Sequence, residues 1–126
     1  MWGVVSYYER LHDGLGSPVT LVDTGRVTRP IPYAVDWDRD GDLDLVVQTF
    51  SSATHFGWEE GAFLYYERLA DGGLQQRQGP GNNPFHGLKG LAAFADLDDD
   101  GDVDLILGRP DGLRPTAGRD ARRQPP

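Results

Sequence analysis

Short segments that are mostly apolar or that alternate between apolar and polar residues run along the chain, separated by stretches rich in turn residues such as Gly, Pro and Asp. Such segments are typical of β-strands, and no long stretch has apolar positions at helical spacing. The pattern therefore predicts an all-β fold. Between residues 31 and 78 it predicts four strands, with residues 51–61 as a loop: Ile31 to Val35, Leu43 to Phe50, Ala62 to Leu69 and a more polar Leu74 to Gln78.

The chain contains an internal repeat. The segment Tyr7-Tyr8-Glu9-Arg10-Leu11 recurs as Tyr65-Tyr66-Glu67-Arg68-Leu69. The segment from Asp36 to Val47 recurs, with the same pattern of aspartates, as Asp96 to Leu107. The order of the elements is the same in both copies, so the chain is built from one repeated unit.

The copies of the unit are out of phase with the ends of the chain. Residues 31–78 form one whole unit, residues 91–108 supply the first two strands of a unit, and residues 2–23 supply the last two. Four antiparallel strands, of which the outermost is the least apolar, are the pattern of a β-propeller blade, so we expect about two blades.

The chain has two aspartate-rich loops, one in each of the two copies, and each lies between the first and second strands of its unit. Each has Asp at positions 1, 3, 5, 7 and 9 and Gly at position 6. The residues are Asp36, Asp38, Asp40, Asp42 and Asp44 in the first loop, and Asp96, Asp98, Asp100, Asp102 and Asp104 in the second.

This spacing predicts a calcium site in each loop, and therefore two ions per chain. Ca²⁺ takes six to eight oxygen ligands in flexible geometry. Carboxylates at positions 1, 3, 5 and 9 and the carbonyl at position 7 can surround one ion, while Gly at position 6 permits the positive φ of a tight reversal. The intervening Trp37, Arg39, Leu97 and Asp99 are expected to point away.

Other interpretations of the loops fit less well. An EF-hand requires Glu at position 12 and flanking helices, whereas position 12 is Val47 or Leu107 and both flanks resemble strands. Mg²⁺ prefers to keep several waters in strict octahedral geometry, and Zn²⁺ prefers His or Cys. A plain polar hairpin would not need five aspartates in register twice.

The motif Asp36-x-Asp38-x-Asp40-Gly41-x-x-Asp44-Leu45-x-Val47 and its second copy resemble the FG-GAP/VCBS repeat. Such repeats form the blades of integrin α-subunit propellers and of related lectins. The resemblance covers roughly residues 2–108. It implies a calcium-stiffened propeller module that binds a protein or glycan ligand, or mediates adhesion, outside the cell.

About two blades cannot close a ring, since propellers usually have four to eight. The chain is therefore expected to be part of a longer protein or the protomer of a homo-oligomer. Residues 2–23 could complete the blade begun by residues 91–108, either within one chain or between chains, and so cover the open strand edges.

Composition and charge narrow the function classes. The net charge is −8, and eleven of the 20 acidic residues lie in the two loops, so we expect no nucleic-acid partner. No cysteine is present, no apolar run can span a bilayer, and residues 2–8 lack the features of a signal peptide. The Arg- and Pro-rich residues 109–126 are predicted to be a disordered tail after a domain of residues 1–108.

No catalytic motif occurs in the sequence, so we expect a non-catalytic module. The three histidines, His12, His55 and His86, are interpreted as loop residues. An alternative is a carbohydrate-binding module or an accessory module of a secreted enzyme. Its candidates for stacking on sugar rings are Trp2, Trp58, Tyr65 and Tyr66, although packing between blades is a competing role for them.

Overall fold

The computed structural model describes residues 2–26, 28–54 and 57–108, and within them the fold is all-β. The ten strands are β1 (Trp2–Tyr7), β2 (Arg10–Leu11), β3 (Gly14–Leu15), β4 (Val19–Arg26), β5 (Thr28–Val35), β6 (Asp44–Thr54), β7 (Gly57–Arg68), β8 (Leu74–Arg77), β9 (Leu91–Ala95) and β10 (Asp104–Gly108). All pairings are antiparallel. The all-β prediction is therefore confirmed.

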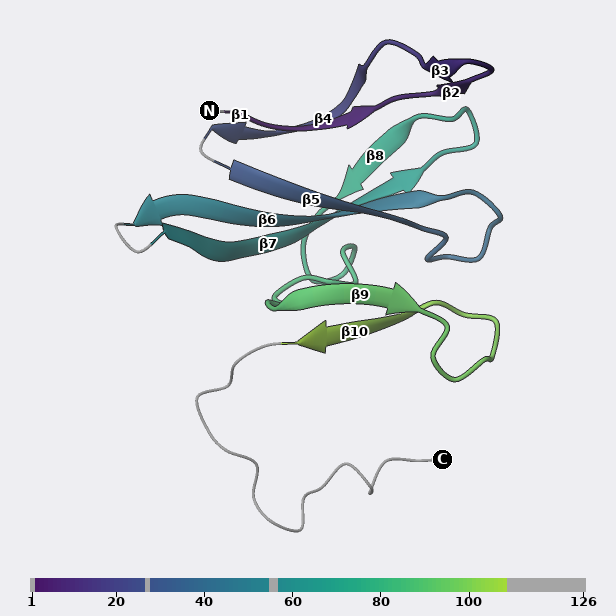
Figure 1. The fold of residues 1–126 in the computed structure, drawn as a ribbon. Coiled ribbons are helices and arrows are strands. Elements are labelled where there is room, and N and C mark those ends of the chain that lie inside the picture. The colour runs from purple at the N-terminus through teal and green to yellow at the C-terminus, as the bar shows by residue number, and fades with distance from the viewer. Residues whose placement is uncertain (1, 27, 55–56, 109–126) are drawn as a thin grey trace.

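The four strands predicted between residues 31 and 78 form one sheet in the order β5-β6-β7-β8, which we call the central sheet. A two-stranded sheet of β1 and β4, the N-terminal sheet, precedes it in the chain, and a two-stranded sheet of β9 and β10, the C-terminal sheet, follows it. The small β2–β3 ribbon extends the hairpin of the N-terminal sheet (Figure 1).

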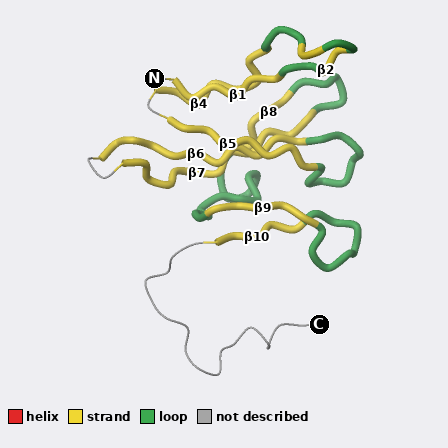
Figure 2. The backbone as a smooth tube through the Cα atoms, viewed as in Figure 1, coloured by secondary structure: helices red, strands yellow, loops and turns green. Residues whose placement is uncertain are grey.

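The three sheets are layered, with the central sheet in the middle (Figures 1 and 2). This order follows from the alternation of side chains along β6, where successive residues face opposite sides. Val46 belongs to the apolar cluster shared with the C-terminal sheet, while Leu45 and Val47 belong to the cluster shared with Val5 and Val22 of the N-terminal sheet. Residues 44–49 of β6 are thus buried on both faces of the sheet.

The connection between β8 and β9 contributes a buried aromatic residue, Phe85, to the apolar cluster between the central and C-terminal sheets. Phe85 is 1% exposed and lies against the rings of Trp37, Tyr65 and Phe94, with centroids 4.7–5.8 Å away. Its position is held by Asn83, whose side chain donates a hydrogen bond to the carbonyl of Phe63 and accepts one from the Phe85 N–H. A loop segment therefore fills the space between two sheets.

Two sequence-based predictions about the strands are wrong. Residues 51–61 do not form one long loop, because β6 continues to Thr54 and β7 starts at Gly57, with residues 55–56 outside the described part. The two strands stay paired there, with one register irregularity between Ser51 and Thr54, since backbone pairing does not require apolar side chains. The hypothesis that residues 2–23 complete the C-terminal sheet within one chain also fails, because the central sheet separates the two.

Candidate metal centres

The first aspartate loop joins β5 to β6 and is shaped by its own carboxylates. Asp36 accepts hydrogen bonds from the backbone N–H groups of Asp40 and Gly41, at 3.2 and 3.0 Å. Asp40 accepts one from the N–H of Asp42 at 2.9 Å. Gly41 has a φ of 91°, so the positive φ predicted at position 6 is confirmed.

The second loop, between β9 and β10, repeats this arrangement. Asp96 accepts hydrogen bonds from the N–H groups of Asp100 and Gly101, at 3.1 and 2.8 Å, and Asp100 accepts one from Asp102 at 2.9 Å. The φ of Gly101 is 92°. The two loops therefore fold alike because the same side chains satisfy the same backbone donors.

Carboxylates converge in both loops, but not to the same extent. In the second loop Asp96, Asp98, Asp100 and Asp104 each place one oxygen within 4.8 Å of the others. In the first loop Asp36, Asp38 and Asp40 form such a group, and Asp44 lies outside it. The carbonyl oxygens of Asp42 and Asp102 remain predicted ligands.

The aspartate at position 9, Asp44 or Asp104, differs most between the two loops. Asp44 is 1% exposed and accepts two backbone hydrogen bonds, from the N–H of Trp37 at 3.1 Å and from that of Arg68 in β7 at 2.9 Å. Asp104 accepts the equivalent bond from Leu97 at 2.9 Å. In the described chain β10 pairs with β9 alone, so Asp104 has no strand in the position of β7.

Three of the side chains between the aspartates, those of Trp37, Arg39 and Leu97, make no contact with the carboxylates of their own loop that the structure shows. Trp37 packs against Phe85, whereas Leu97 is 72% exposed. Arg39 forms an ion pair with Asp102 of the other loop, Nε to Oδ1, at 2.9 Å. The two loops therefore touch at the same end of neighbouring sheets.

Position 4 of each loop also adopts a left-handed backbone conformation. Both Arg39 and Asp99 have a φ of 61°. Asp tolerates this region, whereas Arg adopts it rarely. The sequence contained no signal for this feature, because only glycine marks a positive φ reliably.

Crowding of the carboxylates shifts their pKa values in opposite directions. Desolvation, a hydrogen bond with Asp40 and the negative charges of Asp44 and Asp40 raise the pKa of Asp38 to about 6. The N–H of Asp42 lowers the pKa of Asp40. In the second loop the pKa of Asp98 is raised by desolvation and by Asp100, and the pKa of Asp100 is lowered by the N–H of Asp102. Asp38 and Asp98 therefore take up a proton more readily than an isolated Asp does, and a bound cation would oppose that protonation.

The aromatic candidates for sugar stacking are resolved in part. Tyr65 is buried and Tyr66 is half-buried, and each packs in one of the two clusters between sheets, so the packing interpretation is confirmed for this pair. The side chains of Trp2 and Trp58 lie outside the described part of the structure, as does His55. His12 and His86 lie in turns, as predicted.

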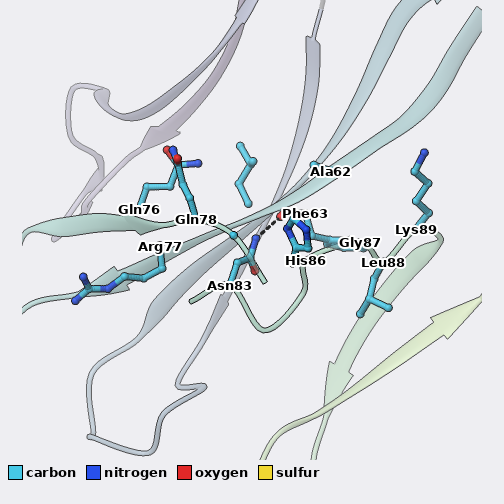
Figure 3. Close-up of a pocket in the computed structure, with 12 residues that line it drawn as sticks. Ala62, Phe63, Gln76, Arg77, Gln78, Asn83, His86, Gly87, Leu88 and Lys89 are labelled. Carbon is cyan, nitrogen blue, oxygen red and sulfur yellow. Dashed lines mark hydrogen bonds between the residues drawn. The ribbon is translucent and has the colours of Figure 1, made fainter. Parts of the chain in front are cut away.

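A pocket of about 510 Å³ lies beside β7, β8 and the connection to β9 (Figure 3). Gln76, Gln78, His86 and Lys89 contribute polar side chains, while Phe63 and Leu88 contribute apolar surface. No carboxylate, hydroxyl or thiol side chain is among its lining residues. No sequence pattern marks these positions as a pocket, because they come from two strands and a loop.

Comparisons with family models, with curated proteins and with solved structures found no match to this chain. The resemblance to FG-GAP/VCBS repeats therefore depends on the motif residues alone. The described residues also include no helix of the length and hydrophobicity that crossing a membrane requires.

Proposed function

We propose that the chain is a calcium-binding module of β-propeller type, in which the three layered sheets correspond to one whole blade and two half blades. The observation that carries the proposal is the repeated aspartate loop, whose carboxylates converge to within 4.8 Å at equivalent places in two sheets. Exposed acidic residues would normally repel one another. Their convergence at two equivalent places favours a site for a positive ion.

The donor set fits calcium better than other common metals. All candidate side-chain ligands are carboxylates, and neither cluster contains His or Cys. Hard oxygen ligands in a loop without fixed octahedral geometry suit Ca²⁺. Asp36, Asp38 and Asp40 would hold the ion in the first loop, with Asp44 as the predicted fourth carboxylate. Asp96, Asp98, Asp100 and Asp104 would hold it in the second.

Isothermal titration calorimetry on chelator-treated protein tests this proposal directly. We expect two calcium ions per chain, with dissociation constants on the order of 10⁻⁴ M, as in extracellular modules with exposed sites. Asp38→Asn and Asp98→Asn should each remove one site. Asp99→Asn is the matched control, because Asp99 belongs to the second loop but lies outside its carboxylate group. A stoichiometry of zero would reject the proposal.

We further propose that the module acts without catalysis, as an extracellular ligand-binding or adhesion domain. The support is the resemblance of the loops to repeats that mostly have this role. Bound calcium would stiffen the ends of the sheets, while loops and pockets elsewhere contact the partner. A glycan array and a protein-binding screen, both run with calcium and with chelator, would separate a lectin from a protein adhesin.

A further inference from the structure

The outer edge of β10 is open in the described chain. The repeat relates Asp104–Gly108 of β10 to Asp44–Gln48 of β6. Strand β6 pairs on both sides, with β5 and with β7, whereas β10 pairs with β9 alone. An unpaired strand edge of this kind is a template for another strand.

In the complete unit β7 occupies the corresponding edge of β6. The chain has an equivalent of β7, but it lies far from β10. The segment Tyr7–Arg10 is equivalent by the repeat to Tyr65–Arg68 of β7. The pair of Arg10 with Leu15 in the β2–β3 ribbon matches the pair of Arg68 with Leu74. The N-terminal hairpin is thus the equivalent of β7 and β8, but it packs on the opposite face of the central sheet from β10 (Figure 1).

Apolar side chains are exposed at the positions that an added sheet would cover. Ile106 is 38% exposed, while its equivalent Val46 is fully buried against the C-terminal sheet. Tyr7 is 50% exposed, while its equivalent Tyr65 is 4% exposed. Leu97, at the position of the packed Trp37, is exposed as well. Ile106 and Tyr7 thus have buried counterparts in the complete unit, and Leu97 has a partly buried one.

We propose that β1 of a second copy of this chain adds to the free edge of β10, in the register that β7 adopts on β6. In the central sheet Val46 lies opposite Tyr65 and Gln48 lies opposite Phe63. The repeat transfers this register to Ile106 opposite Tyr7 of the second copy, and Gly108 opposite its Val5. The Arg10 N–H then donates to Asp104, as that of Arg68 does to Asp44.

This contact is head-to-tail, since β10 of one copy meets β1 of the next. Heterologous contacts produce rings when the rotation closes. Each copy adds the equivalent of two four-stranded sheets, so about two to four copies would give the four to eight sheets of a propeller. The sheet completed by β10 and β1 would also have a neighbouring sheet to pack against, because Val5 of β1 already faces the central sheet of its own copy.

Charges at position 4 of the loops make the proposed contact between copies weaker than the contact between the central and C-terminal sheets of one copy. Arg39 of the central sheet pairs with Asp102 of the next sheet. Across the proposed interface the corresponding residues are Asp99 and Asp42, which are both negative. The association should therefore strengthen with salt, because salt screens repulsion between exposed charges.

Light scattering after size exclusion, in calcium, tests the proposal first. We expect a mass two to four times 13.9 kDa at about 50 μM protein. Ile106→Lys should reduce the mass to that of one chain, whereas Ala70→Lys, a change of the same kind in the exposed turn after β7, should leave it unchanged. A monomeric parent chain, or equal behaviour of the two variants, would overturn the proposal.

Disulfide trapping tests the register independently, because the chain has no natural cysteine. The double variant Tyr7→Cys/Ile106→Cys should form covalent multimers on oxidation, since directly opposed residues lie within disulfide reach. In the control Val19→Cys/Ile106→Cys the first cysteine is one strand further away, because Val19 is the β4 partner of Tyr7. Cross-linking equal in both variants, or absent in the first, would refute the register.

The variant Asp99→Arg provides a gain-of-association test. Arg39 shows that arginine is accommodated at this position with the same φ of 61°. The new side chain could pair with Asp42 of the next copy, so we expect association to become a few-fold tighter. Unchanged or weaker association would contradict the placement of the two loops across the interface.

Discussion

The two aspartate loops share a sequence pattern and a backbone conformation, but they differ at the ninth residue. Asp44 is buried and is bonded to backbone groups from its own loop and from β7, whereas Asp104 is half-exposed and is bonded to its own loop. The shape of the loop is therefore a local property of its own sequence. The burial of its last carboxylate depends on a strand that is distant in sequence.

The largest loss of stability is expected when the carboxylate at position 9 of a loop is removed. Asp44→Ala leaves two N–H groups without their acceptor at a buried site, which should lower the free energy of unfolding by about 3 kcal/mol. Asp104→Ala should cost less than about 1 kcal/mol, because water can replace the carboxylate at a half-exposed site. Urea denaturation with chelator present measures both. Equal losses would show that β7 does not make the two aspartates different.

A smaller loss of stability, equal in the two loops, is expected when the glycine at position 6 is replaced. Gly41→Ala and Gly101→Ala should each cost about 1–2 kcal/mol, because both residues have a strongly positive φ. A Cβ at Gly41 would meet no atom within 4 Å, and one at Gly101 would meet only Arg39 Nη2 at 3.5 Å. Backbone strain is then the common cause. Thermal unfolding of both variants would contradict this explanation if one lost far more stability than the other.

Calcium binding should weaken with acidity in both loops. The pKa of Asp38 is about 6, and the ion needs the ionised carboxyl group, so affinity at the first loop should fall about tenfold per pH unit below 6. Without calcium the same raised pKa stabilises the folded chain fully below the ordinary pKa of 3.8, and this contribution is lost as pH rises through about 6. Calorimetry at pH 5.0 and 7.5 measures the first effect. Asp38→Asn, which binds no such proton, should remove the first-loop site at both pH values.

The smallest loss of stability is expected when the ion pair between the two loops is removed. Arg39 and Asp102 are both substantially exposed, so Arg39→Gln should lower the free energy of unfolding by at most about 0.5 kcal/mol. The loss should decrease further at high salt, because salt screens the attraction between the two charges. A loss several times larger would indicate that the pair holds the two sheets together.

Features that depend on neighbouring residues could be predicted from the sequence. The order of the strands in the central sheet, the limits of the two aspartate loops and the positive φ of Gly41 follow from apolar patterning, turn residues and the absence of a side chain on glycine. The packing of Tyr65 between sheets is consistent with its place in an alternating, aromatic segment. These features require only the local chain and the general need to bury apolar surface.

Features that depend on distant pairing could not be predicted. The hydrogen bond from Arg68 to Asp44 joins residues far apart in the chain, and Phe85 reaches the core from a segment with no strand pattern. The ends of β6 and β7, residues 51–54 and 57–61, contain polar residues that alone suggest a loop. The layering of the sheets, which separates β1 from β10, also results from packing across the whole chain.

Phe85 stands between the central and C-terminal sheets as a spacer, and its size contributes to the angle at which one sheet follows the next. In an assembly that repeats this contact around an axis, a small change of angle at each step accumulates over the full circle. Replacing Phe85 with a smaller side chain would then alter how many protomers complete the circle, as well as their stability. If copies assemble as proposed, the volume of one loop residue would thus affect how many of them form the ring.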